Sequence, residues 1–231
     1  MKTIGLIGGM SWESTIPYYR IINQTIKQKL GGFHSAKLVL VSVDFHEIEE
    51  LQRAGDWDGA AAILSQAAKS LEAAGADFIV ICTNTMHKVA PTIEQAVKLP
   101  IFHIADPTAE EIKRQGIQTI GLLGTRFTME QDFYKERLRS RHSLEVVIPN
   151  SEDMDIIHRI IYHELCLGKV EDASRQEYRR IMAQLVAQRA QGIILGCTEI
   201  SLLVGAADAS VPLFDTTGLH ASKAAEFALL D

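Results

Sequence analysis

Positions 3–9 read TIGLIGG, and positions 119–125 read TIGLLGT. Two further segments recur at nearly the same separation, since FIVICTNT at 78–85 corresponds to GIILGCTE at 192–199, and LPIF at 99–102 corresponds to VPLF at 211–214. Several landmarks that repeat in the same order indicate two copies of one structural unit. In this alignment Thr83 occupies the position of Cys197. We therefore predict that two copies of an α/β unit are fused in one chain.

Each copy alternates short β-rich runs with longer amphipathic segments, a pattern that predicts a parallel sheet covered by helices on both faces. One helix is expected to begin near Ser14, with Pro17 in its first turn, and to end at Gly31-Gly32. Two alanine-rich helices are expected at 56–74 and 171–191. The predicted strands are 3–7, 37–43, 77–82, 101–104, 119–123, 144–148, 192–195 and 212–214.

The composition excludes several classes of partner. The chain has 231 residues, 47% of them hydrophobic and 23% charged, as expected of a soluble globular protein with one large or two small domains. A net charge of −6 disfavours nucleic acid and anionic lipid as partners. No apolar stretch reaches the roughly 20 residues that a bilayer requires, and Met1 leads into a predicted strand rather than a signal peptide. We expect a cytoplasmic protein.

The sequence lacks the common signatures of metal, disulfide and dinucleotide sites. Its three cysteines form no CxxC pair, and its eight histidines show no metal-binding spacing, so we predict neither disulfides nor a metal site. The glycines at 5, 8 and 9 do not match G-x-G-x-x-G, which disfavours NAD. We expect the turn after the first strand to present Met10, Ser11 and Trp12 to a small ligand, unless it is a simple turn. The corresponding segment 124–128 suits either a carboxylate or an ordinary helix cap.

The best candidates for chemistry follow the strands at 77–82 and 192–195. Ligands of open α/β sheets bind at the carboxyl ends of the strands, so Thr83 and Cys197 are expected to face each other across one cleft. That arrangement suits a reaction with two opposed proton-transfer groups. The backbone N–H groups of the following helix are expected to lower the pKa of Cys197 from about 8.5. The alternatives are a buried structural Cys197 and a Thr83 that caps a helix. Cys82 is offset by one position, which predicts that its side chain faces the core.

Three motifs in order resemble the aspartate/glutamate racemase family, and the resemblance covers essentially the whole chain. They are IGLIGGM at 4–10, TNT at 83–85 and GCTE at 196–199. The resemblance implies two Rossmann-like α/β domains related by pseudo-twofold symmetry, with the active site in the cleft between them, and a homodimer. The implied domains are residues 1–98 plus 209–231 and residues 99–208.

The resemblance also implies an activity, the interconversion of L- and D-amino acids without a cofactor. Two cysteines act on opposite faces of the substrate's α-carbon in this family, but Thr83 replaces the first of them here. A hydroxyl is a weaker acid than a thiol and a poor base. Thr83 can therefore donate or relay a proton only with the assistance of the carbanion or of water. We therefore expect Cys197 to be the competent base and the two enantiomers to be handled unequally.

The remaining family positions surround the amino-acid substrate. Asn84, Thr85, Thr198 and Glu199 carry over to positions around the α-carboxylate and the amino group, and Met10 joins them from the first loop. Aspartate-specific relatives place a basic residue where this chain has Cys166. The segment after the second strand supplies Gln52 and Arg53 as other candidates to bind the side-chain carboxylate of the substrate. A preference for a broader range of substrates, or for neutral side chains, therefore stays open. Without a cofactor, the carbanion must be stabilised by preorganised N–H donors.

Two alternatives remain. A family member of this fold can be a divergent enzyme, such as a decarboxylase, a cis–trans isomerase or a hydantoin racemase. A chain in which Thr83 marks a lost catalytic pair would be an amino-acid-binding protein without turnover.

Overall fold

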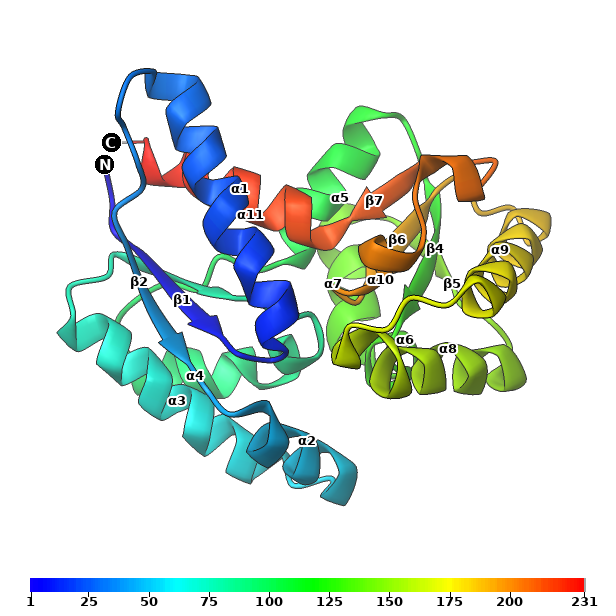
Figure 1. Cartoon of the computed structure of the whole chain (residues 1–231), viewed down its shortest axis with the longest axis horizontal. Coiled ribbons are helices and arrows are strands. Elements are labelled where there is room, and N and C mark those ends of the chain that lie inside the picture. Colours follow the sequence, from blue (N-terminus) through cyan, green and yellow to red (C-terminus); the bar gives the residue numbers. More distant parts are fainter. Residues whose placement is uncertain (231) are drawn as a thin grey trace. The chain divides into compact units, whose positions relative to one another are not determined.

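The computed structural model describes residues 1–230, which divide into two compact units. The first unit contains residues 1–104 and the chain from His220 onward, and the second contains residues 105–219. Each unit has a parallel sheet covered by helices, as Figure 1 shows. The predicted α/β class with two Rossmann-like parallel sheets is confirmed. No helix within residues 1–230 is long and apolar enough to cross a membrane.

The first sheet has the strand order β2-β1-β3, with all pairs parallel. Its strands are β1 (Ile4–Gly8), β2 (Leu38–Ser42) and β3 (Phe78–Ile81). One face packs against α1 (Trp12–Leu30) and the later turns of α11 (Thr216–Ala228). The other face packs against α2 (Phe45–Ala54), α3 (Trp57–Ala73) and α4 (Ala90–Ala96). The fully buried side chains of β1 and β3 alternate between these two cores.

The second sheet has the strand order β5-β4-β6-β7, again entirely parallel. Its strands are β4 (Thr119–Gly124), β5 (Glu145–Val147), β6 (Ile193–Gly196) and β7 (Leu213–Asp215). One core packs α8 (Ser151–His163), η2 (Leu165–Leu167), α9 (Asp172–Ala187) and α10 (Ile200–Leu203) against β4 and β6. Helices α5 (Ala105–Arg114) and α7 (Asp132–His142) pack together and contact β7 and β5, and the short α6 (Arg126–Glu130) follows β4.

The strand registers confirm the internal repeat. Gly5 of β1 lies opposite Ile79 of β3, and Gly121 of β4 lies opposite Ile193 of β6, as the sequence alignment requires. Both glycines lie where a helix crosses the central strand closely. A Cβ atom at Gly5 would lie 3.1 Å from Leu71 Cδ1, and one at Gly121 would lie 3.1 Å from Leu185 Cδ1. The repeated glycines therefore reflect the same helix-on-strand packing in both units.

The predicted strand at 101–104 is wrong. Only a single parallel bridge joins Ile79 to Ile101. The chain cannot continue as a strand because the Ile104 N–H donates to His87 Nε2 (3.2 Å) and α5 begins at the next residue. The fourth strand of the first sheet is thereby reduced to one bridge.

The chain changes unit later than the predicted boundaries at 98 and 208. The contact units meet between Ile104 and Ala105 and between Leu219 and His220. Residues 209–219, which the family resemblance assigns to the first domain, include β7, and this strand pairs with β6 of the second sheet. The domain boundaries taken from the resemblance stay a prediction.

An ion pair joins α5 to α7 and leads to a first prediction. Arg137 donates to both carboxylate oxygens of Asp106 (2.7 and 2.6 Å), and His142 Nε2 lies 3.1 Å from the same group. Burial acts to raise the pKa of Asp106, but the hydrogen bonds from Arg137 and His142 outweigh it and lower the pKa. We expect Asp106→Asn to lower the free energy of unfolding by about 1–3 kcal/mol, because it weakens the acceptor for a partly buried guanidinium.

The pH dependence of this loss follows from the lowered pKa of Asp106. The stabilisation is complete above the unfolded value of about 3.9 and disappears as the pH falls through the folded value. Urea titrations of the unsubstituted protein and of Asp106→Asn, at neutral and at acid pH, measure the free energy of unfolding. The difference between the two proteins should vanish at acid pH. Asp172→Asn is the matched control, because Asp172 is 89% exposed beside Arg175 and should contribute less than about 1 kcal/mol. A pH-independent difference would contradict the role of the Asp106 charge.

Candidate functional site

Thr83 and Cys197 lie at equivalent places, just beyond the carboxyl ends of β3 and β6. Both side chains are partly exposed within their units. The residues that follow them in the chain are buried: Asn84 and Thr85 in the first unit, Thr198 and Glu199 in the second. In each unit, one partly exposed side chain thus precedes a buried polar pair.

In the first unit, a histidine that the sequence analysis did not single out holds the Thr83 turn. His87 Nδ1 lies 2.8 Å from the carbonyl oxygen of Thr83, and His87 Nε2 accepts the Ile104 N–H. Because Nε2 is an acceptor, Nδ1 carries the proton and donates to Thr83. The N-cap residue of η1 (Thr85–Val89) is Asn84, with no side-chain cap hydrogen bond, so the cap interpretation of Thr83 gains no support. Cys82 is buried in the core, as predicted.

Met10 and Gln52 lie beside the same turn, through Met86. Gln52 Nε2 is 2.9 Å from Met86 Sδ, and Met10 belongs to the same apolar cluster as Met86. The structure therefore places Gln52 against Met86, the residue after the Thr83–Thr85 segment, and Met10 in the same apolar cluster as Met86. Both Met10 and Gln52 are almost fully buried, whereas Arg53 is exposed and pairs with Glu49 and Glu50 of its own helix.

In the second unit, a buried carboxylate faces the Cys197 thiol. Cys197 Sγ donates to Glu199 Oε2 at 2.9 Å, and Thr198 Oγ1 donates to the same oxygen at 2.9 Å. Glu199 is 2% exposed. The arrangement gives the thiol an immediate acceptor for its proton.

The prediction that the turn lowers the pKa of Cys197 is wrong. Burial raises this pKa well above its usual range, and the charge of Glu199 raises it further. The helix expected to oppose this effect, α10, has only four residues. Cys197 is therefore a neutral thiol at rest, hydrogen-bonded to Glu199.

Cys166 of η2 lies close to this pair. It packs against the same apolar core as Cys197. Burial and then the Glu199 charge raise its pKa, so it is also a neutral thiol. The second unit thus brings together Cys166, Cys197, Thr198 and Glu199.

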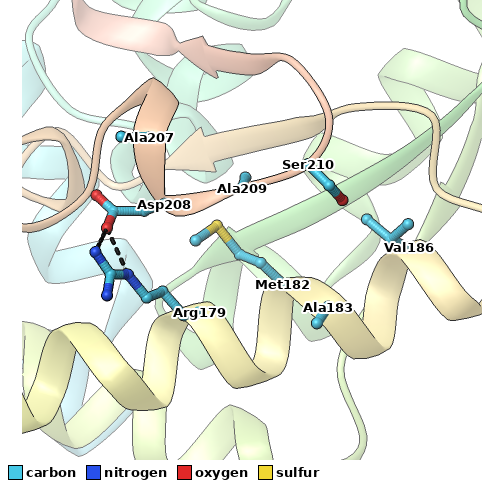
Figure 2. Close-up of a pocket in the computed structure, with 8 residues that line it drawn as sticks. All are labelled: Arg179, Met182, Ala183, Val186, Ala207, Asp208, Ala209 and Ser210. Atoms are coloured by element: carbon cyan, nitrogen blue, oxygen red, sulfur yellow. Dashed lines mark hydrogen bonds and ion pairs between the residues drawn. The ribbon is translucent and has the colours of Figure 1, made fainter.

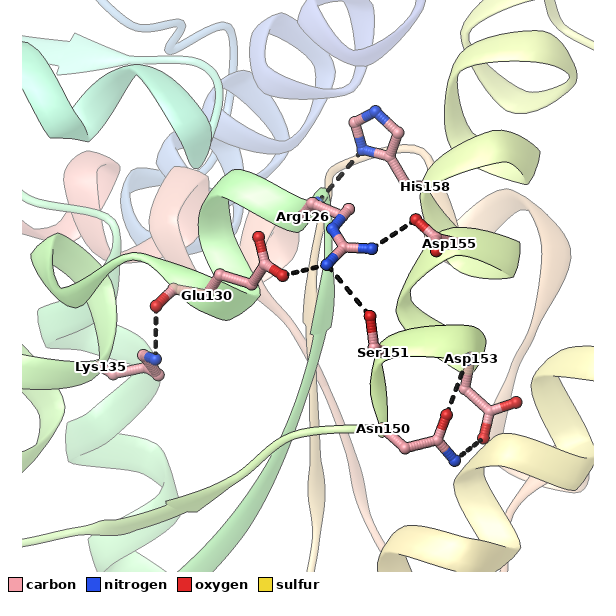
Figure 3. A network of polar contacts seen from close by, with 8 residues as sticks. All are labelled: Arg126, Glu130, Lys135, Asn150, Ser151, Asp153, Asp155 and His158. Atoms are coloured by element: carbon pink, nitrogen blue, oxygen red, sulfur yellow. Dashed lines mark hydrogen bonds and ion pairs between the residues drawn. The ribbon is translucent and has the colours of Figure 1, made fainter.

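The loop after β4 contains a helix cap and an occupied arginine. Thr125 Oγ1 accepts the Thr128 N–H (3.3 Å), which confirms the cap interpretation of this segment. The Arg126 guanidinium pairs with Glu130 and Asp155, and its backbone N–H donates to His158 Nδ1 at 3.2 Å (Figure 3). Arg126 is therefore committed to carboxylates of its own unit.

A pocket of about 370 Å³ opens between α9 and the segment that contains η3 (Ala206–Asp208) (Figure 2). Arg179 and Asp208 form an ion pair of 2.5 Å at its edge. Its lining residues are Arg179, Met182, Ala183, Val186, Ala207, Asp208, Ala209 and Ser210. None of them is a predicted site residue, so the pocket is separate from the candidate site. Across residues 1–230, no group of three or more His, Cys, Asp or Glu side chains is arranged to hold a metal ion.

The turn after β1 depends on Gly9, which leads to a second prediction. Gly9 has φ +94°, and a Cβ atom there would lie 2.2 Å from the Val43 carbonyl oxygen. We expect Gly9→Ala to lower the free energy of unfolding by about 2–5 kcal/mol, through both the left-handed backbone and the clash. Gly75→Ala is the matched control, because Gly75 has φ +81° but open space around it. Chemical denaturation measures both, and equal losses would contradict the role of the clash.

Comparisons with known proteins identify the family of this chain. The profile of the Asp/Glu/hydantoin racemase family matches residues 7–224. The broad specificity amino-acid racemase RacX of Bacillus subtilis (strain 168) is 24% identical over 95% of both chains. A crystal structure from Yersinia pestis, provisionally described as an Asp/Glu racemase, is 64% identical with a TM-score of 0.92 and covers 100% of both chains. An aspartate racemase homologue from Pyrococcus horikoshii OT3 is 38% identical with a TM-score of 0.83, covering 99% of both chains. The chain therefore belongs to the Asp/Glu/hydantoin racemase family.

Proposed function

We propose that this protein is a cofactor-independent amino-acid racemase of the aspartate/glutamate type, in which Cys197 and Thr83 serve opposite faces of the substrate's α-carbon. The observation that carries the proposal is the hydrogen bond from the Cys197 thiol to Glu199. Cys197 occupies the position in the second unit that Thr83 occupies in the first. A thiol with a built-in proton acceptor and a hydroxyl at the matching strand end are the two groups that a two-sided proton transfer needs.

The reaction begins when the Cys197 proton passes to Glu199 Oε2. The thiolate then removes the proton from Cα, and the electron pair left on Cα is delocalised into the α-carboxylate. The Thr83 hydroxyl gives its proton to the opposite face as it takes one from water, so no alkoxide accumulates. The proton held by Glu199 then passes to the hydroxide that this water leaves, and the site returns to its starting state. The net exchange is one substrate proton for one solvent proton, with inversion at Cα. Because the hydroxyl is the weaker acid and base, the two enantiomers react at different rates.

The buried polar pairs are the proposed contacts to the common part of the substrate. Asn84, Thr85 and Thr198 suit the α-carboxylate, and a carboxyl oxygen of Glu199 suits the ammonium group as a hydrogen-bond acceptor. These groups stabilise the carbanion when they are fixed before the reaction begins. Their burial and the hydrogen bonds within the Cys197–Glu199 segment support such preorganisation.

Met10 is the proposed contact of the first loop to the α-carboxylate and the amino group, whereas Gln52 and Cys166 are the proposed contacts to the substrate side chain. Gln52 and Cys166 present an amide and a neutral thiol, and neither carries a positive charge for a second carboxylate. The Bacillus subtilis relative is described as having broad specificity. A test of substrates must therefore include neutral as well as acidic amino acids.

The decisive experiment is proton NMR of the purified protein with L- and D-amino acids in deuterated water, without added cofactor or metal. Loss of the Cα proton signal, together with inversion seen by chiral chromatography, would establish racemisation and identify the substrate. Binding without exchange would favour the amino-acid-binding alternative, and a different product would favour a divergent enzyme. The homodimer and the cytoplasmic location stay predictions, which light scattering and cell fractionation would test.

A further inference from the structure

Tyr178 is a buried phenol for which the proposed mechanism has so far no role. It lies on α9, and its side chain has no exposed surface. It belongs to the apolar core of the second unit, against which both Cys166 and Cys197 pack. Its hydroxyl makes no hydrogen bond to any group within residues 1–230. Buried hydroxyls are nearly always hydrogen-bonded, so an exception requires an explanation.

Several acidic groups act on the Tyr178 hydroxyl, and Cys197 is the first of them. Burial raises the pKa of Tyr178, and among the ionisable groups Cys197 raises it most, followed by Glu164, Cys166 and Glu199. Tyr178 is therefore protonated throughout the physiological range and keeps its hydrogen-bond donor. Tyr178 and Cys197 also pack in the same core, so an ionised Cys197 would be an acceptor in the surroundings of this donor.

We propose that Tyr178 is a positioning residue that donates its unused hydrogen bond to the Cys197 sulfur when the thiol ionises. The inference rests on the proposed function, in which the thiolate is the base. At rest the thiol donates to Glu199, so its sulfur requires no donor. After the proton has moved to Glu199, the buried sulfur carries a full negative charge and needs one. A donor that is already in place stabilises that charge without reorganisation.

The proposal predicts that Tyr178→Phe lowers kcat without lowering the stability of the fold. Tyr178→Phe removes a hydroxyl that makes no hydrogen bond in the resting protein, so the midpoint of thermal unfolding should stay the same or rise. The same variant removes a hydrogen bond to a charged sulfur, so kcat should fall about 10- to 100-fold with little change in KM. A merely structural tyrosine would lose stability and would not separate kcat from KM.

Alkylation of Cys197 tests the proposal independently of turnover. Iodoacetamide reacts with the thiolate, and peptide mass spectrometry identifies the modified cysteine. In Tyr178→Phe, the alkylation rate of Cys197 should fall about tenfold or more across neutral and alkaline pH. Tyr134→Phe is the matched control, because Tyr134 is also fully buried in this unit but lies on α7, where burial and then Asp106 raise its pKa.

The outcomes separate the two proposals. An unchanged alkylation rate in Tyr178→Phe, or an equal fall in Tyr134→Phe, would overturn the role of Tyr178 even in an active racemase. A specific fall in Tyr178→Phe supports the hydrogen bond to the thiolate, even if no amino acid exchanges its Cα proton and the proposed function fails.

Discussion

Replacement of Cys197 by serine is expected to lower the rate of Cα proton exchange about 10³-fold or more, in both directions, while the protein stays folded. The serine hydroxyl can still donate to Glu199, so the hydrogen bond that fixes this turn is kept. What is lost is the base, since a hydroxyl ionises far less readily than a thiol in the same buried place. Proton NMR in deuterated water measures the exchange, and circular dichroism checks the fold.

Cys82→Ala is the matched control for this loss. Cys82 is buried among apolar residues of β1, β3 and α1, and burial raises its pKa far out of the physiological range. We expect this variant to lose some stability and to keep its exchange activity at a temperature where it is folded. Full activity in Cys197→Ser would remove the proposed mechanism. Loss of activity in folded Cys82→Ala would instead show that Cys82 replaces the thiol missing at position 83.

The sequence predicts the repeated architecture well because the repeated positions hold residues whose packing is strongly constrained. Gly5 and Gly121 recur where a leucine of the crossing helix lies 3.1 Å from the place of a Cβ atom on the central strand. Thr83 and Cys197 occupy equivalent positions after β3 and β6, because the strand registers are the same in both sheets. These features depend on local spacing, which a single sequence contains.

The wrong predictions concern side-chain interactions and burial, which the spacing of residues in the sequence does not specify. The strand expected at 101–104 is lost because the imidazole of His87 takes the Ile104 N–H. The lowered pKa expected for Cys197 is reversed by its burial and by Glu199, two residues on but with its carboxylate turned back to the thiol. Tyr178 could not be found from sequence, because a tyrosine at helical spacing is indistinguishable from an ordinary core residue until its hydroxyl is shown without a partner.

Replacement of Thr83 by valine is expected to separate proton exchange from inversion. Valine has nearly the shape of threonine but no hydroxyl, so nothing at position 83 can deliver a proton to the second face. Racemisation should fall about 100-fold or more. The enantiomer whose Cα proton faces Cys197 should still take up deuterium, because the Cys197–Glu199 pair can exchange its proton with solvent and return a deuteron to the same face. Chiral chromatography and NMR on the same sample measure both rates.

Thr83→Ser and Thr83→Cys complete the test of the second face. Serine keeps the hydroxyl and should racemise at a rate close to that of threonine. Cysteine supplies a stronger acid and a competent base, so it should keep or raise the rate and make the two enantiomers react more equally. A folded Thr83→Cys protein that binds amino acids but neither exchanges nor inverts them would contradict the assignment of position 83 to the second face. Equal loss of exchange for both enantiomers in Thr83→Val would also contradict it, because the Cys197 half-reaction does not require the Thr83 hydroxyl.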